Sequence, residues 1–219
     1  MNKDELIQKT ELFVKETLEG AEAGHDWSHI ERVVRNARKI GAEEKADPFV
    51  TELAALLHDI ADSKFHDGDE SLGPERASGF LRELGLPEDV VEHVEQIVRH
   101  ISFKNELEPS HEKAFDSIEL QVLKDADRLD AIGAIGIARA FHYGGFKNRA
   151  IYDPSVDPLE VQSKEDYKSS KAPTINHFYE KLLLLKDKMN TKAGQKLAEQ
   201  RHAFMVEFLE QFYAEWEGS

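Results

Sequence analysis

A histidine and an aspartate stand side by side in "LLHDIAD", where His58 and Asp59 directly follow the apolar run "ELAALL". A helix with such a run is buried, and a carboxylate buried without a cation, hydrogen-bond donors or water is costly. The two side chains lie about 100° apart on a helix, so only a ligand placed against the helix flank could touch both. Taken alone, the pair is better explained by a partly exposed helix end, because a single His-Asp dipeptide is common.

Two further residues of the same chemical types occur where other helices are expected. His29 lies in "HDWSHIERV", in the first turn of an earlier helix, and Asp127 lies among the apolar residues of "DADRLDAIGAIG". Imidazole nitrogen together with carboxylate oxygen suits a divalent ion such as Mn²⁺, Fe²⁺, Ni²⁺, Co²⁺ or Mg²⁺, and six-coordination leaves about two positions for water and substrate. The residues therefore predict one divalent metal ion and a hydrolytic reaction.

These residues, in this order and within "GHDWSHIERV", "LLHDIAD" and "DADRLDAIGAIG", resemble the H…HD…D signature of the HD-domain superfamily of metal-dependent phosphohydrolases, in particular its single-domain bacterial branch. The resemblance covers about residues 20–145, and the C-terminal helices at about 174–216 also fit. It implies an all-α fold, the HD-domain helical bundle, as a single domain over residues 1–219. It also implies the metal ligands, which are His29, His58, Asp59 and Asp127. Some close relatives in that branch are similar to nucleotide pyrophosphohydrolases, which release pyrophosphate from nucleoside triphosphates.

Asp59 and Asp62 are the candidate catalytic carboxylates. Asp62 follows His58 by four residues and so is expected on the same helix face, where it could orient the attacking water or protonate the leaving group. Either Asp59 or Asp62 could take the proton of the water. A solvated carboxylate is the alternative for Asp62.

Four side chains are candidates for binding substrate: Lys104, His100, Arg128 and His25. His100 lies at the margin of an apolar helix stripe, so a second metal ligand, a phosphate contact and a boundary histidine all stay open. His25 precedes His29 by one helical turn and is either a partner of the site or an exposed residue. Arg128 either binds phosphate or pairs with a neighbouring carboxylate.

The leading function is hydrolysis of a phosphate ester or anhydride, with a nucleoside triphosphate cut to monophosphate and pyrophosphate. The same site would serve a nucleotidase, a phosphomonoesterase or a phosphodiesterase. A dinuclear iron oxygenase of this fold would need two further histidines, for which order alone offers His66, His93, His100 and His111. A non-catalytic nucleotide sensor would keep the pocket and bind a nucleotide without turnover.

The amino-acid composition disfavours some classes of binding partner and of active site. The 219 residues hold 28 Lys and Arg against 43 Asp and Glu, a formal charge of −15, so a polynucleotide would meet net repulsion. A small phosphorylated substrate is compatible with this charge, because a metal ion or a few local cations outweigh the distant field. The absence of Cys excludes thiolate metal sites and cysteine nucleophiles. The polar N-terminus and the lack of a long apolar run predict a cytoplasmic protein without a membrane partner. A homodimer is a separate expectation, because dimers are common among soluble proteins.

Apolar residues at spacings of three and four, with capping and stop residues, predict helices along nearly the whole chain. The expected ranges are 6–18, 26–41, 48–62, 74–84, 87–101, 116–142, about 174–189 and 191–216. Gly133 and Gly136 are spaced to let another helix approach closely. Residues 144–173 form a long connector with two Asp-Pro pairs, which makes this segment a candidate lid or binding loop.

Overall fold

The computed structural model describes residues 1–20, 26–60, 71–101, 115–159 and 172–219. Every regular element in these ranges is helical, which confirms the predicted all-α class. The chain divides into two compact units, residues 1–127 and residues 128–219. The prediction of a single functional domain stays a prediction.

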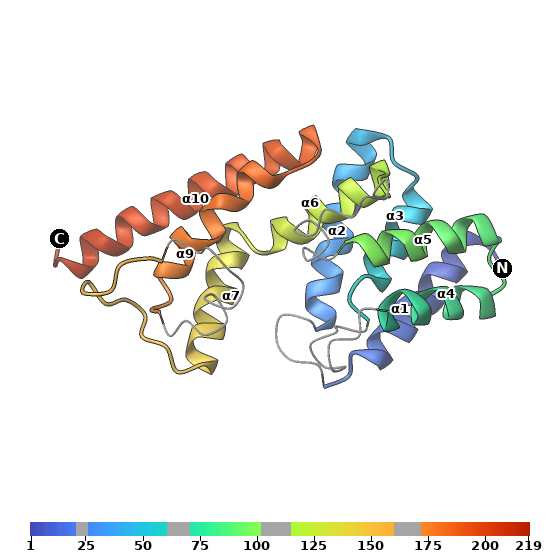
Figure 1. Ribbon diagram of the computed structural model, residues 1–219. Coiled ribbons are helices and arrows are strands. Elements are labelled where there is room, and N and C mark those ends of the chain that lie inside the picture. Colours follow the sequence, from blue (N-terminus) through green and yellow to red (C-terminus); the bar gives the residue numbers. More distant parts are fainter. Residues whose placement is uncertain (21–25, 61–70, 102–114, 160–171) are drawn as a thin grey trace. The chain divides into compact units, whose positions relative to one another are not determined.

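Helix α3 contacts more helices of the N-terminal unit than its neighbours do, and Figure 1 labels these helices. This helix packs against α1, α2 and α5, and α4 packs on α5. The five α3 side chains from Leu53 to Leu57 are at most 1% exposed, so the centre of the core lies directly before the His58-Asp59 pair. The helices of this unit are α1 (Lys3–Thr17), α2 (Trp27–Glu44), α3 (Pro48–Leu57), α4 (Leu72–Glu83), α5 (Glu88–His100) and α6 (Ile118–Asp130), the last up to Asp127.

Aspartate caps fix where the two central helices begin. Asp26 accepts a hydrogen bond from the His29 backbone N–H at 3.0 Å, and Asp47 accepts from the first N–H groups of α3, whose first residue is Pro48. At its other end α3 stops at Leu57, with His58 as the C-cap, so the expected helix through residue 62 is too long. The buried apolar run ends at this point, and aspartate favours turns over helix interiors.

The connection after α6 differs from the sequence prediction. The single helix expected over 116–142 is wrong, because α6 ends at Asp130 and α7 begins at Gly133 (Gly133–Phe146). Gly133 has φ +73°, a left-handed conformation that a glycine adopts without steric cost. The expectation that another helix approaches Gly133 is confirmed, since a Cβ there would meet Arg201 of α10 (Lys192–Trp216) at 3.0 Å.

The C-terminal unit packs α10 against α7 and against η3 (Leu182–Lys188), a 3₁₀ helix that follows the short α9 (Asn176–Glu180). One α-helix was expected over about 174–189. Leu182 and Leu185 are the buried leucines of η3, and a 3₁₀ helix with three residues per turn puts them on one face. Of the candidate lid, residues 144–146 belong to α7 and residues 160–171 lie outside the described residues. Among the described helices, none combines the length and apolar character needed to cross a membrane.

Gly136 provides a test of how tightly the α6–α7 connection is packed. A Cβ at this position would lie 2.2 Å from the backbone oxygen of Ala131, whereas a Cβ at Gly145 of the same helix would meet nothing within 4 Å. We expect Gly136→Ala to lower the free energy of unfolding by about 1–3 kcal/mol, as other overpacked sites do. Gly145→Ala should be neutral or slightly stabilising, because alanine is the better helix former. Chemical denaturation of both variants checks this, and equal stabilities would contradict the close approach.

Candidate metal centre

Three residues singled out by the sequence converge in the N-terminal unit. His29, His58 and Asp59 each offer one donor atom, and these atoms all lie within 4.8 Å of one another. His29 comes from the first turn of α2, while His58 and Asp59 follow the last residue of α3. Because α2 and α3 pack against each other, residues far apart in sequence meet at one point.

Asp127 joins this group from α6. Its Oδ1 lies 3.5 Å from Nε2 of His29, so a carboxylate from a further helix lies beside this imidazole. The His29 side chain is 4% exposed, whereas that of Asp127 is 44% exposed. The group is therefore buried at the histidine and accessible to solvent at the carboxylate, as a site that admits water and a small substrate requires.

The orientation of His58 is fixed by its own helix. Its Nδ1 lies 2.9 Å from the carbonyl oxygen of Ala55. A carbonyl oxygen can only accept, so Nδ1 carries the proton and Nε2 carries the lone pair. A metal-ligating histidine typically donates its other ring N–H in this way, which fixes the tautomer and the ring orientation. The His58 ring lies 5.4 Å from that of His29 at 62°, so the two rings are not stacked.

The donor set fits a divalent ion. Two imidazole nitrogens and two carboxylate oxygens are ligand types that Mn²⁺, Fe²⁺, Co²⁺ and Ni²⁺ accept, and carboxylate oxygens suit Mg²⁺. The positive charge of such an ion would also offset the cost of holding carboxylates beside a buried ring. Which ion binds, and how many, stay predictions.

Only some of the predicted catalytic and substrate-binding residues lie within the described part of the chain. Asp62, Lys104 and His25 lie outside the described residues. The helical spacing between His58 and Asp62 is not supported, because α3 ends at Leu57. Arg128 donates from Nη1 to the carbonyl oxygen of Lys188 at 2.6 Å within the C-terminal unit. Its role toward phosphate stays a prediction.

Three other histidines of the described residues, His93, His100 and His177, have surroundings of other kinds. His100 is the last residue of α5, and its Nδ1 lies 2.8 Å from the carbonyl oxygen of Gln96. His93 Nε2 lies 3.2 Å from Ser117 Oγ and 3.4 Å from a carboxylate oxygen of Glu119. In the C-terminal unit, burial together with the Lys181 and Arg149 cations lowers the pKa of His177 to about 4, so this histidine is neutral. His66 and His111 lie outside the described residues.

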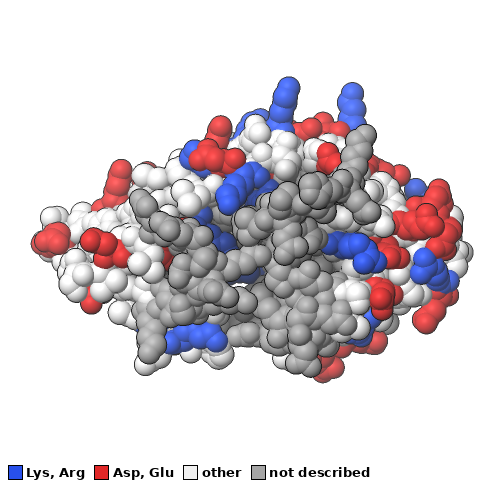
Figure 2. All heavy atoms as spheres, in the orientation of Figure 1, with Lys and Arg blue, Asp and Glu red and all other residues white. Residues whose placement is uncertain are grey.

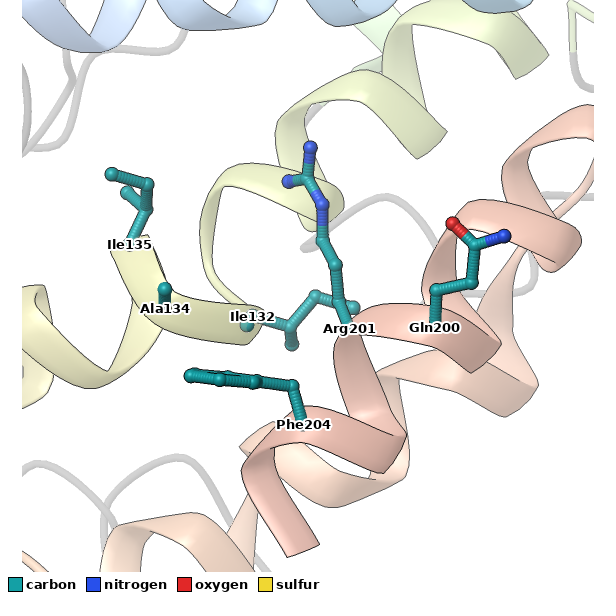
Figure 3. Close-up of a pocket in the computed structure, with 7 residues that line it drawn as sticks. Ile132, Ala134, Ile135, Gln200, Arg201 and Phe204 are labelled. Atoms are coloured by element: carbon teal, nitrogen blue, oxygen red, sulfur yellow. The ribbon is translucent and has the colours of Figure 1, made fainter. Parts of the chain in front are cut away.

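A separate pocket of about 290 Å³ lies in the C-terminal unit. Figure 3 shows Ile132, Ala134, Ile135 and Phe204 around it, with the Arg201 side chain extended toward the end of α6. Arg201 donates from Nη1 to the backbone oxygen of Leu129, so its guanidinium caps the carbonyl end of α6. None of the predicted site residues lines this pocket.

Fold and cluster together define a class of protein: an all-helical protein whose histidine and aspartate side chains from three helices can hold a divalent ion. The model of the HD domain family matches residues 26–132, a segment that contains all four candidate ligands. The chain belongs to the HD domain family.

Relatives cover nearly the whole chain. The uncharacterized protein YpgQ of Bacillus subtilis is 39% identical over 204 residues, which are 93% of this chain and 90% of YpgQ. The crystal structure of an HD-superfamily hydrolase from Bacillus thuringiensis matches with a TM-score of 0.80 and 43% identity over 100% of both chains. The crystal structure of Bacillus subtilis YpgQ in complex with ADP matches with a TM-score of 0.75 and 35% identity over 98% of this chain and 97% of that one. Family and cluster together support a metal-dependent phosphohydrolase.

Removal of the central ligands should remove the metal. We expect wild-type protein reconstituted with Mn²⁺ to hold close to one ion per chain and the double variant His58→Ala, Asp59→Ala to hold almost none. An ion that binds only the folded state at 100 times its Kd adds about 2.7 kcal/mol of stability. Wild-type protein should therefore gain thermal stability with Mn²⁺ and the double variant should not. Elemental analysis and thermal melts measure both effects.

His142→Ala is the matched control, because His142 is an exposed histidine on α7 in the other unit. It should keep the metal content and the stabilisation by Mn²⁺. Full metal retention by the double variant would refute the ligand assignment.

Proposed function

We propose that this protein hydrolyses nucleoside triphosphates to monophosphates and pyrophosphate at one divalent metal ion, with His29, His58, Asp59 and Asp127 as ligands. The observation that carries the proposal is the convergence of donor atoms from α2, the end of α3 and α6. This donor set leaves coordination positions for water and for a phosphate oxygen.

A nucleotide substrate is supported by a relative. YpgQ of Bacillus subtilis has been crystallised in complex with ADP, and that structure aligns with 98% of this chain. ADP contains the base, the sugar and the anhydride between the α- and β-phosphates. This anhydride is the bond that the proposed reaction breaks.

The charge distribution favours a small substrate whose phosphates are neutralised by a metal. Residues 1–127 contain 15 Lys and Arg against 30 Asp and Glu, whereas residues 128–219 contain 13 of each kind. The unit with the metal cluster therefore carries the whole formal charge of −15. On the face drawn in Figure 2, acidic and basic groups of the described residues are interspersed, and they form no continuous basic stripe there. Polyphosphate approaches such a unit only where a cation offsets the repulsion.

The chemistry divides between the ion and the side chains. A divalent ion, when bound, supplies a Lewis acid for a phosphoryl oxygen and lowers the pKa of a water. Asp59 lies beside both histidines and can accept the proton of the attacking water. The water oxygen forms a bond to the α-phosphorus as the bond to the bridging oxygen breaks, and pyrophosphate leaves with that electron pair. Asp62 remains our candidate for handling protons at the leaving group.

Product identity tests the proposed bond. With Mn²⁺, a panel of ribo- and deoxyribonucleoside triphosphates should yield monophosphate and pyrophosphate in equal amounts, and a chelator should abolish the reaction. Inorganic phosphate and pyrophosphate are scored separately, with the His58→Ala, Asp59→Ala variant as the background control.

Other products assign other functions. Phosphate release from monophosphates, with triphosphates untouched, would favour a nucleotidase or general phosphatase. Nucleotide binding without turnover would favour a sensor, and two iron ions per chain would favour the oxygenase. Each of these outcomes would overturn the proposed reaction.

Asp62→Asn separates proton handling from metal binding. The amide keeps the shape of the carboxylate but cannot act as a base. Because general acid-base catalysis typically contributes about 10²- to 10⁴-fold, we expect kcat to fall at least tens-fold with metal content near wild type. Asp67→Asn, in the same stretch of sequence, is the matched control and should keep normal kcat. Normal turnover by Asp62→Asn would mean that this carboxylate is merely solvated.

A further inference from the structure

The fourth candidate ligand depends on a helix that the other three do not involve. His29, His58 and Asp59 come from α2 and α3, which pack against each other. Asp127 comes from α6, and its carboxylate reaches Nε2 of His29 only if α6 keeps its place along α2. Metal–ligand distances in built sites hold within about 0.2 Å, so a small shift of α6 would be felt at the metal.

One hydrogen bond ties α2 to α6 beside this ligand. The side-chain Nδ2 of Asn36 donates to the backbone oxygen of Ala126 at 3.2 Å, and Ala126 directly precedes Asp127. Asn36 follows His29 by seven residues, which is two turns of α2, so both side chains lie on the same face of the helix. Ala126 is fully buried, so this bond is partly shielded from water.

A second contact shows the direction in which the helices run. A Cβ at Gly41, near the end of α2, would lie 3.8 Å from a methyl group of Val122 on α6. His29 therefore faces Asp127, Asn36 faces Ala126, and Gly41 faces Val122, so positions ascend along α2 as they descend along α6. The two helices therefore run in opposite directions past each other, and the Asn36 hydrogen bond is a polar contact that relates their positions.

We propose that Asn36 is a positioning residue of the metal centre: its side-chain amide holds the Ala126 carbonyl and thereby keeps the Asp127 carboxylate within reach of a metal bound to His29. The inference rests on the proposed metal site, and it adds to that site a residue that donates no ligand atom. A purely structural Asn36 would affect the stability of the metal-free protein alone. A positioning Asn36 also affects metal affinity.

Two substitutions test the role of Asn36. Asn36→Ala removes the donor, and Asn36→Asp keeps the shape while replacing the donating amide by a carboxylate. Both should weaken Mn²⁺ binding about 10- to 100-fold in titration calorimetry, the range seen when partners that orient ligands are lost. The added negative charge of Asn36→Asp would by itself favour a cation, so weaker binding by this variant cannot be a simple charge effect.

Glu119→Ala is the matched control. Glu119 lies near the other end of α6, where its carboxylate accepts a hydrogen bond from the Asp47 backbone N–H at 2.9 Å and faces His93. Its loss should lower the melting temperature of the metal-free protein as Asn36→Ala does, but leave Mn²⁺ affinity within about twofold. The melting temperature without metal and the Mn²⁺ affinity are measured on all variants.

The outcomes separate the inference from the function on which it rests. Wild-type affinity in both Asn36 variants would overturn the positioning role and leave the metal site standing. An equal loss of affinity in Glu119→Ala would also overturn it, because α6 packing in general would then control the site. Absence of Mn²⁺ binding by the wild-type protein would overturn the metal site and the inference together.

Discussion

The structure of the N-terminal unit depends on the electrostatic cost of bringing two imidazoles and two carboxylates together beside a dry core. Carboxylates held beside a buried ring are stable only with a compensating cation, hydrogen bonds or water. The His29 ring is buried, and donor atoms of His29, His58 and Asp59 lie within 4.8 Å of one another. The Asp127 carboxylate, from α6, lies 3.5 Å from His29. A divalent ion held by these residues would meet this requirement and would supply hydrolytic chemistry at the same time.

The local structure around the cluster follows from this requirement. The α3 helix ends one residue before His58, so the HD pair lies on a turn at the edge of the core, where the side chains of both residues can meet His29. The Ala55 carbonyl fixes the tautomer of His58, and the Asp26 cap fixes the first turn of α2 that carries His29. Groups at the ends of α2 and α3 thus position these candidate ligands, without any further secondary-structure element.

The two units differ in formal net charge and in the function that we propose for them. The N-terminal unit carries the metal cluster and the entire net negative charge, and the C-terminal unit is formally neutral. A phosphorylated substrate must therefore overcome repulsion at the unit where the proposed reaction takes place. Under the proposed function, the ion would be a condition for substrate approach as well as for chemistry, and the same charge would disfavour polynucleotides.

The sequence by itself determined the all-α class, most helix starts and the four candidate ligands, because apolar spacing, caps and residue chemistry are local properties. The sequence did not determine where α3 and α6 end. Aspartates and a glycine within apolar runs are compatible with a continuing helix, so packing decides where each helix stops. Only the tertiary structure brought Asp127 to His29 and placed His58 and Asp59 beside His29. The hydrogen bond from Asn36 to Ala126 was likewise decided by the tertiary structure, because a bond between residues 90 positions apart leaves no periodic signal in the sequence.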